Sequence, residues 1–134
     1  MKRAFFSVIL LIIAFTSVSW ADSDTYFPGG VEQEINTPEK LKKIIDSGDP
    51  RFVIVDIRSE AAYRTGHIPT AICIPMGETS KMKNPPGKEK YIILYCYVGG
   101  SVYHVRLKMP EQGYKYVYPW GGTFGWPYPL EKSE

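Results

Sequence analysis

The chain has 134 residues, of which 44% are hydrophobic and 22% are charged. These proportions are typical of a single folded domain and exclude a disordered chain, because aromatic and strand-forming residues are plentiful. The two cysteines are too few for a disulfide scaffold or for a zinc site built from four thiolates.

The start of the chain has the layout of a secretory signal peptide. Lys2 and Arg3 give a positive start, an apolar run covers residues 4–15, and a Ser-Trp-Ala sequence ending at Ala21 offers the small residues that a signal peptidase reads. An uncleaved membrane anchor is the alternative, for which the run is short. We therefore expect residues 1–21 to be a signal peptide, and the mature protein to be periplasmic or secreted, away from the membrane.

Removing this segment leaves a chain without net charge. The full sequence has 16 basic and 14 acidic side chains, and the signal segment contributes two of the bases, Lys2 and Arg3, and no acid. Nucleic-acid binding requires a basic surface, so we expect no nucleic-acid partner.

The first part of the remaining chain predicts a lead-in, a helix and a strand. Residues 22–36 are irregular, with a short first strand at residues 32–35. Thr37, followed by a proline, is a strong helix start, and the helix ends at Gly48. Residues 51–56 are apolar and β-branched, which is typical of a strand buried on both faces.

The rest of the chain continues this alternation. In order we expect a helical turn, a strand, a loop, a strand, a helix, a strand and a terminal helical turn, at residues 59–64, 71–75, 76–90, 91–96, 102–109, 114–118 and 124–126. Pro110 should end the helix before it, and Gly121 and Gly122 should break the last strand. Such alternation predicts an α/β fold with helices on both faces of a parallel sheet.

Cys96 ends one of these strands, and the reactive groups of such sheets lie at the carboxyl ends of strands. The segment after it opens into a helix and comprises Tyr97, Val98, Gly99, Gly100 and Ser101. A glycine-containing loop can aim several backbone N–H groups at the sulfur, and the helix N-terminus adds its positive dipole end. Both effects favour a thiolate and would hold an anion such as a persulfide beside it. A buried structural cysteine is the alternative.

Several short motifs occur in a fixed order around this cysteine. They are Thr37-Pro38-Glu39-Lys40-Leu41, Asp56-Ile57-Arg58, Gly66-His67-Ile68-Pro69, Cys96 with its loop, and Gly121-Gly122-Thr123-Phe124-Gly125-Trp126. With these motifs the sequence from Thr37 to about Trp126 resembles the rhodanese-like (sulfurtransferase) domain family. The resemblance implies a rhodanese-like domain over residues 37–134, a five-stranded parallel sheet flanked by helices on both faces, and a cysteine that carries sulfane sulfur.

The loop departs from many single-domain members of this family, which carry an arginine where this chain has Ser101. Uncharged loops with a serine also occur in the family, among thiosulfate sulfurtransferases, so the sequence is compatible with sulfur transfer. The missing guanidinium argues against the related phosphatase and arsenate-reductase chemistry, which needs a cationic fork to hold a tetrahedral oxyanion.

Other side chains are candidates for supporting roles. We expect Asp56 and Arg58 to brace the end of the sheet through hydrogen bonds, and Arg58 could also help to hold an anion. Tyr97 and Trp120 follow strand ends and are candidates for lining the mouth of the site. Four lysines of the 76–90 loop could steer an anionic donor or simply form a solvated loop, and these are Lys81, Lys83, Lys88 and Lys90.

Cys73 is the second sulfur of the chain. The strand order implied by the resemblance puts the Asp56 strand between those of Cys73 and Cys96, which separates the cysteines by about 10 Å. A disulfide needs Cα atoms within about 7 Å of each other. We therefore expect Cys73 to be a buried small side chain.

Residues and resemblance together predict a sulfurtransferase. Cys96 takes sulfane sulfur from a small anionic donor such as thiosulfate or polysulfide and passes it, from a persulfide, to a thiophilic acceptor such as a protein thiol. No metal or organic cofactor is expected. The alternatives are a catalytically silent binding module with the same fold, and a sulfur-relay or redox protein that pairs Cys73 with Cys96.

Overall fold

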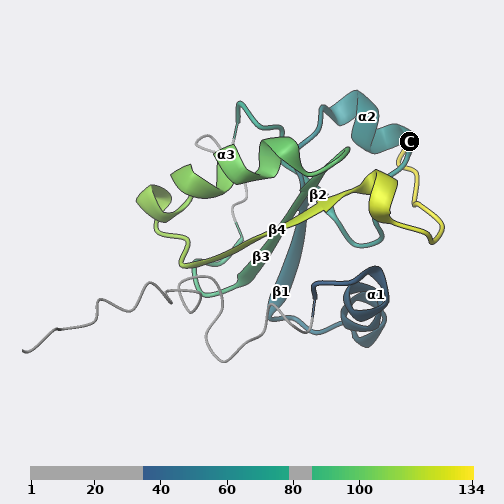
Figure 1. Ribbon diagram of the computed structural model, residues 1–134, viewed down its shortest axis with the longest axis horizontal. Coiled ribbons are helices and arrows are strands. Elements are labelled where there is room, and N and C mark those ends of the chain that lie inside the picture. The colour runs from purple at the N-terminus through teal and green to yellow at the C-terminus, as the bar shows by residue number, and fades with distance from the viewer. Residues whose placement is uncertain (1–34, 79–85) are drawn as a thin grey trace, which may run out of the picture.

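In the computed structural model, which describes residues 35–78 and 86–134, a parallel sheet lies between helices (Figure 1). The described strands run in the order β2-β1-β3-β4, and their bounds are β1 Phe52–Asp56, β2 Ile72–Cys73, β3 Tyr91–Cys96 and β4 Tyr116–Gly122. The α-helices are α1 Pro38–Ser47, α2 Glu60–Thr65 and α3 Gly100–Lys108, and two 3₁₀ turns are η3 Pro110–Gln112 and η4 Thr123–Gly125.

The expected α/β architecture with a parallel sheet is confirmed, although four strands are described where five were expected. The predicted signal peptide and residues 22–34 of the lead-in, which include residues 32–34 of the expected first strand, lie outside the described residues. Within the described ranges, none of the helices has the length and apolar character needed to cross a membrane.

Local signals position α1 as the sequence predicts. The Thr37 side chain accepts a hydrogen bond from the backbone N–H of Lys40 at 3.3 Å, and proline occupies the first turn. At the other end Gly48 adopts a left-handed conformation with φ of 63° and closes the helix by donating to the carbonyl of Ile45. Leu41 is fully buried and directs the helix onto one face of the sheet.

Alternation along β3 divides the core into two halves. Ile92, Leu94 and Cys96 belong to the cluster that packs against α3, whereas Ile93 and Tyr95 belong to the cluster on the α1 side. Figure 1 shows α1 and α3 on opposite faces of the sheet. Because successive side chains of a strand point to opposite faces, the sulfur of Cys96 faces the α3 side of the sheet.

The helix α3 ends at Lys108 and is followed by the turn η3, which begins at Pro110, so the expected early end of this helix is confirmed. The helix begins at Gly100, two positions before the expected start at residue 102. The thiol loop is therefore shorter than the sequence predicts.

The last strand differs most from expectation. Tyr116–Gly122 starts later than residue 114 and runs on through Pro119, with a register shift opposite Leu94 and Tyr95. Proline is tolerated because β4 is the outermost described strand of the sheet. The expected break at Gly121 and Gly122 is wrong, since these glycines pair with β3 beside Tyr95 and Cys96.

A buried ion pair holds the carboxyl end of β1. Nε and Nη2 of Arg58 donate to the Asp56 carboxylate at 2.6 to 3.0 Å, and Nη2 also donates to the carbonyl of Gly66 at 2.7 Å. Asp56 is completely buried and Arg58 is 8% exposed. Burial alone would lower the pKa of Arg58, but hydrogen bonds with Asp56 raise it above the ordinary value of the guanidinium. These contacts are those of the brace that the sequence predicts.

We predict that Asp56→Ala lowers the free energy of unfolding by about 3–5 kcal/mol, because the variant leaves a buried guanidinium without its counter-ion. Urea denaturation followed by circular dichroism measures this change. Asp49→Ala is the matched control, since Asp49 binds Arg51 through the same spacing and almost the same distances, but Arg51 is 59% exposed at its side chain. Equal losses in both variants would contradict the role given to burial.

Candidate active site

Cys96 lies at the carboxyl end of β3 with its sulfur held by the loop that follows. The backbone N–H of Gly99 donates to Sγ at 3.2 Å. Gly99 has a φ of 95° and precedes the first turn of α3, so the chain turns back over the sulfur through a left-handed residue. The thiol is 7% exposed. The sequence predicts several N–H groups and a helix N-terminus beside the sulfur, and the structure shows the Gly99 N–H donating to it beside the start of α3.

A small cavity of about 270 Å³ opens at this thiol. It brings together six of the residues singled out from the sequence, namely Arg58, Cys96, Tyr97, Val98, Gly100 and Ser101. Arg58 lies with its guanidinium carbon 5.0 Å from the centre of the Tyr97 ring, while its Nε and Nη2 remain on Asp56 and Gly66. The cation therefore lines the cavity from a fixed position.

Two apolar residues of this cavity were not anticipated. Ile57 follows β1 directly and is buried, and Met76 follows β2 and is exposed. Their position just after the carboxyl ends of strands is the signal that could have found them. Together with Val98 they make the walls around the thiol largely hydrocarbon.

Gly122 forms the seat of the thiol loop. A Cβ atom on this residue would lie 2.1 Å from the carbonyl oxygen of Tyr97, and one on Gly99 would lie 3.1 Å from Cα of Gly121. The N–H of Phe124 then donates to that same Tyr97 carbonyl at 3.1 Å. Glycine at position 122 allows the end of β4 to touch the loop backbone, which a residue with a Cβ atom would not permit at this distance.

Comparison with known proteins agrees with this geometry. The family model described as "Rhodanese-like domain" matches residues 37–126, more than half of the chain. The chain belongs to the rhodanese-like domain family. The matched range includes the thiol loop, the ion pair of Asp56 with Arg58, and Gly122.

Curated relatives and a solved structure lead to the same family. Thiosulfate sulfurtransferase GlpE of Coxiella burnetii is 36% identical over 73 residues, which are 54% of this chain and 68% of that protein. YtwF of Bacillus subtilis is 30% identical over 94 residues, which are 70% of this chain and 89% of that protein. The crystal structure of a rhodanese-like domain protein from Staphylococcus aureus superposes with a TM-score of 0.63 at 27% identity and covers 73% of this chain and 96% of that one.

Trp120 lies outside the thiol cavity of this rhodanese-like domain. Its ring packs with Trp126 in the cluster on the α1 side, with ring centres 6.0 Å apart. It lines a separate cavity of about 420 Å³ that also contacts Val98 and Phe124. Asp56 is likewise absent from the lining of the thiol cavity and acts on it through Arg58.

The lysines of the 76–90 loop that are described do not surround the thiol. Lys88 donates to the carbonyl of Gln112, and Lys90 donates to the carbonyl of Pro50 at 2.8 Å. Lys90 immediately precedes β3, so both lie toward the amino ends of the strands, opposite Cys96. These two lysines therefore do not line the thiol cavity, in keeping with the alternative of a solvated loop. Lys81 and Lys83 lie outside the described residues.

Cys73 is separated from Cys96 by β1, as expected. The register pairs Cys73 with Asp56 and Asp56 with Tyr95, so a full strand lies between the cysteines, and both thiols are free. Burial, followed by the nearby Asp56 carboxylate, raises the pKa of Cys73 to about 11. Cys73 is only partly buried, rather than enclosed as the sequence suggested.

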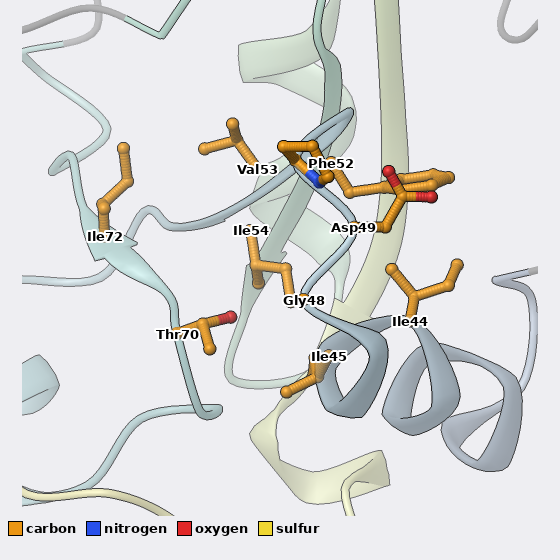
Figure 2. A pocket seen from close by; sticks show the side chains of 10 residues that line it. Ile44, Ile45, Gly48, Asp49, Phe52, Val53, Ile54, Thr70 and Ile72 are labelled. Carbon is orange, nitrogen blue, oxygen red and sulfur yellow. The ribbon is translucent and has the colours of Figure 1, made fainter.

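An apolar pocket of about 380 Å³ lies at the opposite end of β1 (Figure 2). Ile44 and Ile45 of α1 line it together with Ile54 and Ile72 of the sheet. Its only charged lining residue is Asp49, whose pKa is lowered by hydrogen bonds from Arg51. Neither cysteine of the chain lines this pocket. In residues 35–78 and 86–134, no cluster of three or more His, Cys, Asp or Glu side chains could hold a metal ion.

We predict that Gly122→Ala disrupts the thiol loop, because its Cβ would meet the backbone of Tyr97 rather than a movable side chain. Alkylation of Cys96 at neutral pH should slow by about tenfold or more as the Gly99 N–H leaves the sulfur, a loss on the scale of one hydrogen bond to a charged group. Gly125→Ala is the control, since its Cβ would meet nothing within 4 Å. If Gly122→Ala is alkylated at the same rate as the parent chain, Gly122 does not support the thiol loop.

A second prediction concerns the two thiols at different pH. At about pH 8, iodoacetamide should modify Cys96 and leave Cys73 largely unmodified, because Cys73 has a pKa of about 11 and is mostly the unreactive thiol there. Labelling of Cys73 should rise as the pH approaches that value. Peptide mass spectrometry quantifies each cysteine separately. Preferential labelling of Cys73 at the lower pH would contradict the assignment of Cys96 as the reactive sulfur.

Proposed function

We propose that this rhodanese-like domain is a sulfurtransferase whose carrier is Cys96. The Cys96 thiolate attacks the outer sulfur of a donor such as thiosulfate or polysulfide, a new S–S bond forms, and the donor's own bond to that sulfur breaks. With thiosulfate the leaving group is sulfite, which departs with the bonding electron pair. A thiophilic acceptor then takes the outer sulfur and releases the Cys96 thiolate.

The hydrogen bond from Gly99 to the Cys96 sulfur is the observation that carries this proposal. It stabilises the sulfur when it is negative, both as the attacking thiolate and as the leaving thiolate of the second step. The adjoining cavity of about 270 Å³ has room for the outer sulfur beside the first turn of α3. Hydrocarbon from Ile57, Met76 and Val98 reduces the access of water to the persulfide.

Ser101 stands where an arginine would add a formal charge to the loop. Stabilisation of an anion therefore rests on backbone N–H groups, the helix N-terminus and the fixed Arg58 guanidinium. Because Arg58 already neutralises Asp56, the site suits a singly charged persulfide better than a free doubly charged anion. A redox pair between Cys73 and Cys96 gains no support, because β1 separates the two sulfurs and burial keeps Cys73 protonated.

The setting of the reaction is also part of the proposal. The charged start, apolar run and Ser-Trp-Ala ending at Ala21 favour export, which would place the domain in the periplasm or outside the cell. The donor would then be a small sulfur anion of that compartment, and the acceptor a small or protein-borne thiol.

The experiment is intact-mass spectrometry after incubation with thiosulfate or polysulfide. We expect the parent chain and Cys73→Ser each to gain the mass of one sulfur atom, removed again by dithiothreitol, and Cys96→Ser to gain none. Absence of the added sulfur in the parent with both donors would overturn the enzyme assignment and leave a binding module. Its retention in Cys96→Ser would place the carrier elsewhere.

A further inference from the structure

A groove along α3 continues from the thiol cavity. It encloses about 560 Å³ and is lined by Met76, Gly77, Ser101, His104, Val105, Leu107 and Lys108. Met76 and Ser101 also line the smaller cavity at Cys96, so the two spaces adjoin. We call the larger space the α3 groove.

Two apolar side chains of the α3 groove are exposed to solvent and lie outside the hydrophobic core. Leu107 is 67% exposed and Met76 is 52% exposed, although both belong to apolar residue types that are usually buried. Val98, which lines the adjoining thiol cavity, is also exposed. Apolar side chains gathered at the entrance to a reactive group are typical of an interaction surface.

The charge of α3 indicates the partner. From Gly100 to Lys108 the helix carries His104, Arg106 and Lys108, and it contains no aspartate or glutamate. His104 and Lys108 are one turn apart and both line the α3 groove. A partner with acidic side chains beside an apolar one is complementary to this helix.

The volume of the α3 groove favours a polypeptide partner over a small sulfur anion. The thiol cavity of about 270 Å³ already exceeds the needs of a thiosulfate ion, which would leave the α3 groove of about 560 Å³ empty. A polypeptide segment can place a cysteine at the thiol cavity while a neighbouring side chain enters the groove, since adjacent residues span about 3.5 Å.

We propose that the α3 groove docks an acidic protein that presents a cysteine on a protruding segment and receives the sulfane sulfur from Cys96. This inference rests on the proposed function. The partner thiol enters as a thiolate after losing its proton to solvent, and it attacks the outer sulfur of the Cys96 persulfide. The bond from the Cys96 sulfur to that outer sulfur breaks, Cys96 leaves as a thiolate, and no oxidant or reductant is consumed. The partner leaves with a persulfide of its own.

The test uses a short acetylated and amidated peptide, Glu-Leu-Cys-Gly-Asp-Leu, as the acceptor probe, with a second peptide in which both acids are replaced by lysine. Cys96 is first loaded with sulfur, and transfer to each peptide and to free cysteine is followed by stopped-flow kinetics. Leu107→Asp should lower the second-order transfer rate to the acidic peptide by about tenfold, through lost apolar contact and charge repulsion. Transfer to free cysteine and loading by thiosulfate should stay within about twofold, because Leu107 does not line the thiol cavity.

Matched variants separate docking from general damage to α3. Tyr103→Asp places the same charge at an exposed residue of α3 that does not line the groove, and it should transfer to the peptide like the parent. Lys108→Glu should slow transfer to the acidic peptide and speed transfer to the lysine peptide, whereas Lys43→Glu on α1 should do neither. Equal effects of Leu107→Asp and Tyr103→Asp, or no preference of the parent between the two peptides, would overturn the proposal.

A binding measurement keeps this inference separate from the proposed function. The serine analogue of the acidic peptide, carrying a fluorophore, is titrated with Cys96→Ser protein, and its anisotropy reports docking without sulfur transfer. Binding that Leu107→Asp weakens would support the groove even if no persulfide forms in the parent. If Cys96→Ser protein does not bind the peptide although the parent chain loads sulfur normally, the docking site is overturned and the sulfurtransferase proposal stands.

Discussion

The buried ion pair between Asp56 and Arg58 is the contact on which the site depends. It neutralises a carboxylate that has no access to water, and through the Gly66 carbonyl it joins the end of β1 to the turn after α2. The same guanidinium lies against the Tyr97 ring, beside the thiol. One pair of charges thus fixes a sheet end, a turn and one wall of the Cys96 cavity, and it does so at positions where an unpaired charge would be costly.

The chain contains this Asp-x-Arg arrangement twice, and only the fold distinguishes the copies. Asp49 and Arg51 make a pair with almost the same distances as Asp56 and Arg58, yet they lie at the exposed beginning of β1. The spacing of two residues in the sequence allows the aspartate and the arginine to form an ion pair. Whether this ion pair stabilises the protein depends on its burial, because burial lowers the dielectric constant around the charges, and the tertiary structure determines that burial.

The sequence predicts much of this domain because its local signals agree with one another. The Thr37 cap, the apolar strand residues and the glycine loop after Cys96 each specify short-range geometry, and these parts were predicted correctly. The errors concern contacts between distant segments. The sequence predicts that Gly121 and Gly122 break the strand, whereas both pair with β3 and Gly122 approaches the backbone of Tyr97 closely. Local sequence alone does not distinguish these two uses of glycine.

The position of Trp120 is a second feature that the local sequence does not predict. It follows the end of a predicted strand, which made it a candidate for the mouth of the site, but β4 runs on past it. Trp120 keeps the alternation of Tyr116 and Tyr118, which belong to the same cluster, and packs with Trp126 on the face away from the sulfur. The error therefore comes from ending the predicted strand at residue 118, which hides the alternation that continues to Trp120.

The seat of the thiol loop has a consequence for the maturation of the protein. Cys96 meets its supporting glycine only when β4, the last described strand along the chain, has paired with β3. A nascent chain that has been synthesised as far as α3 therefore contains the cysteine and its whole loop, but not the surface against which that loop is shaped. Pairings between distant segments form after local ones. The loop around Cys96 is therefore fully supported only when β4 has joined the sheet.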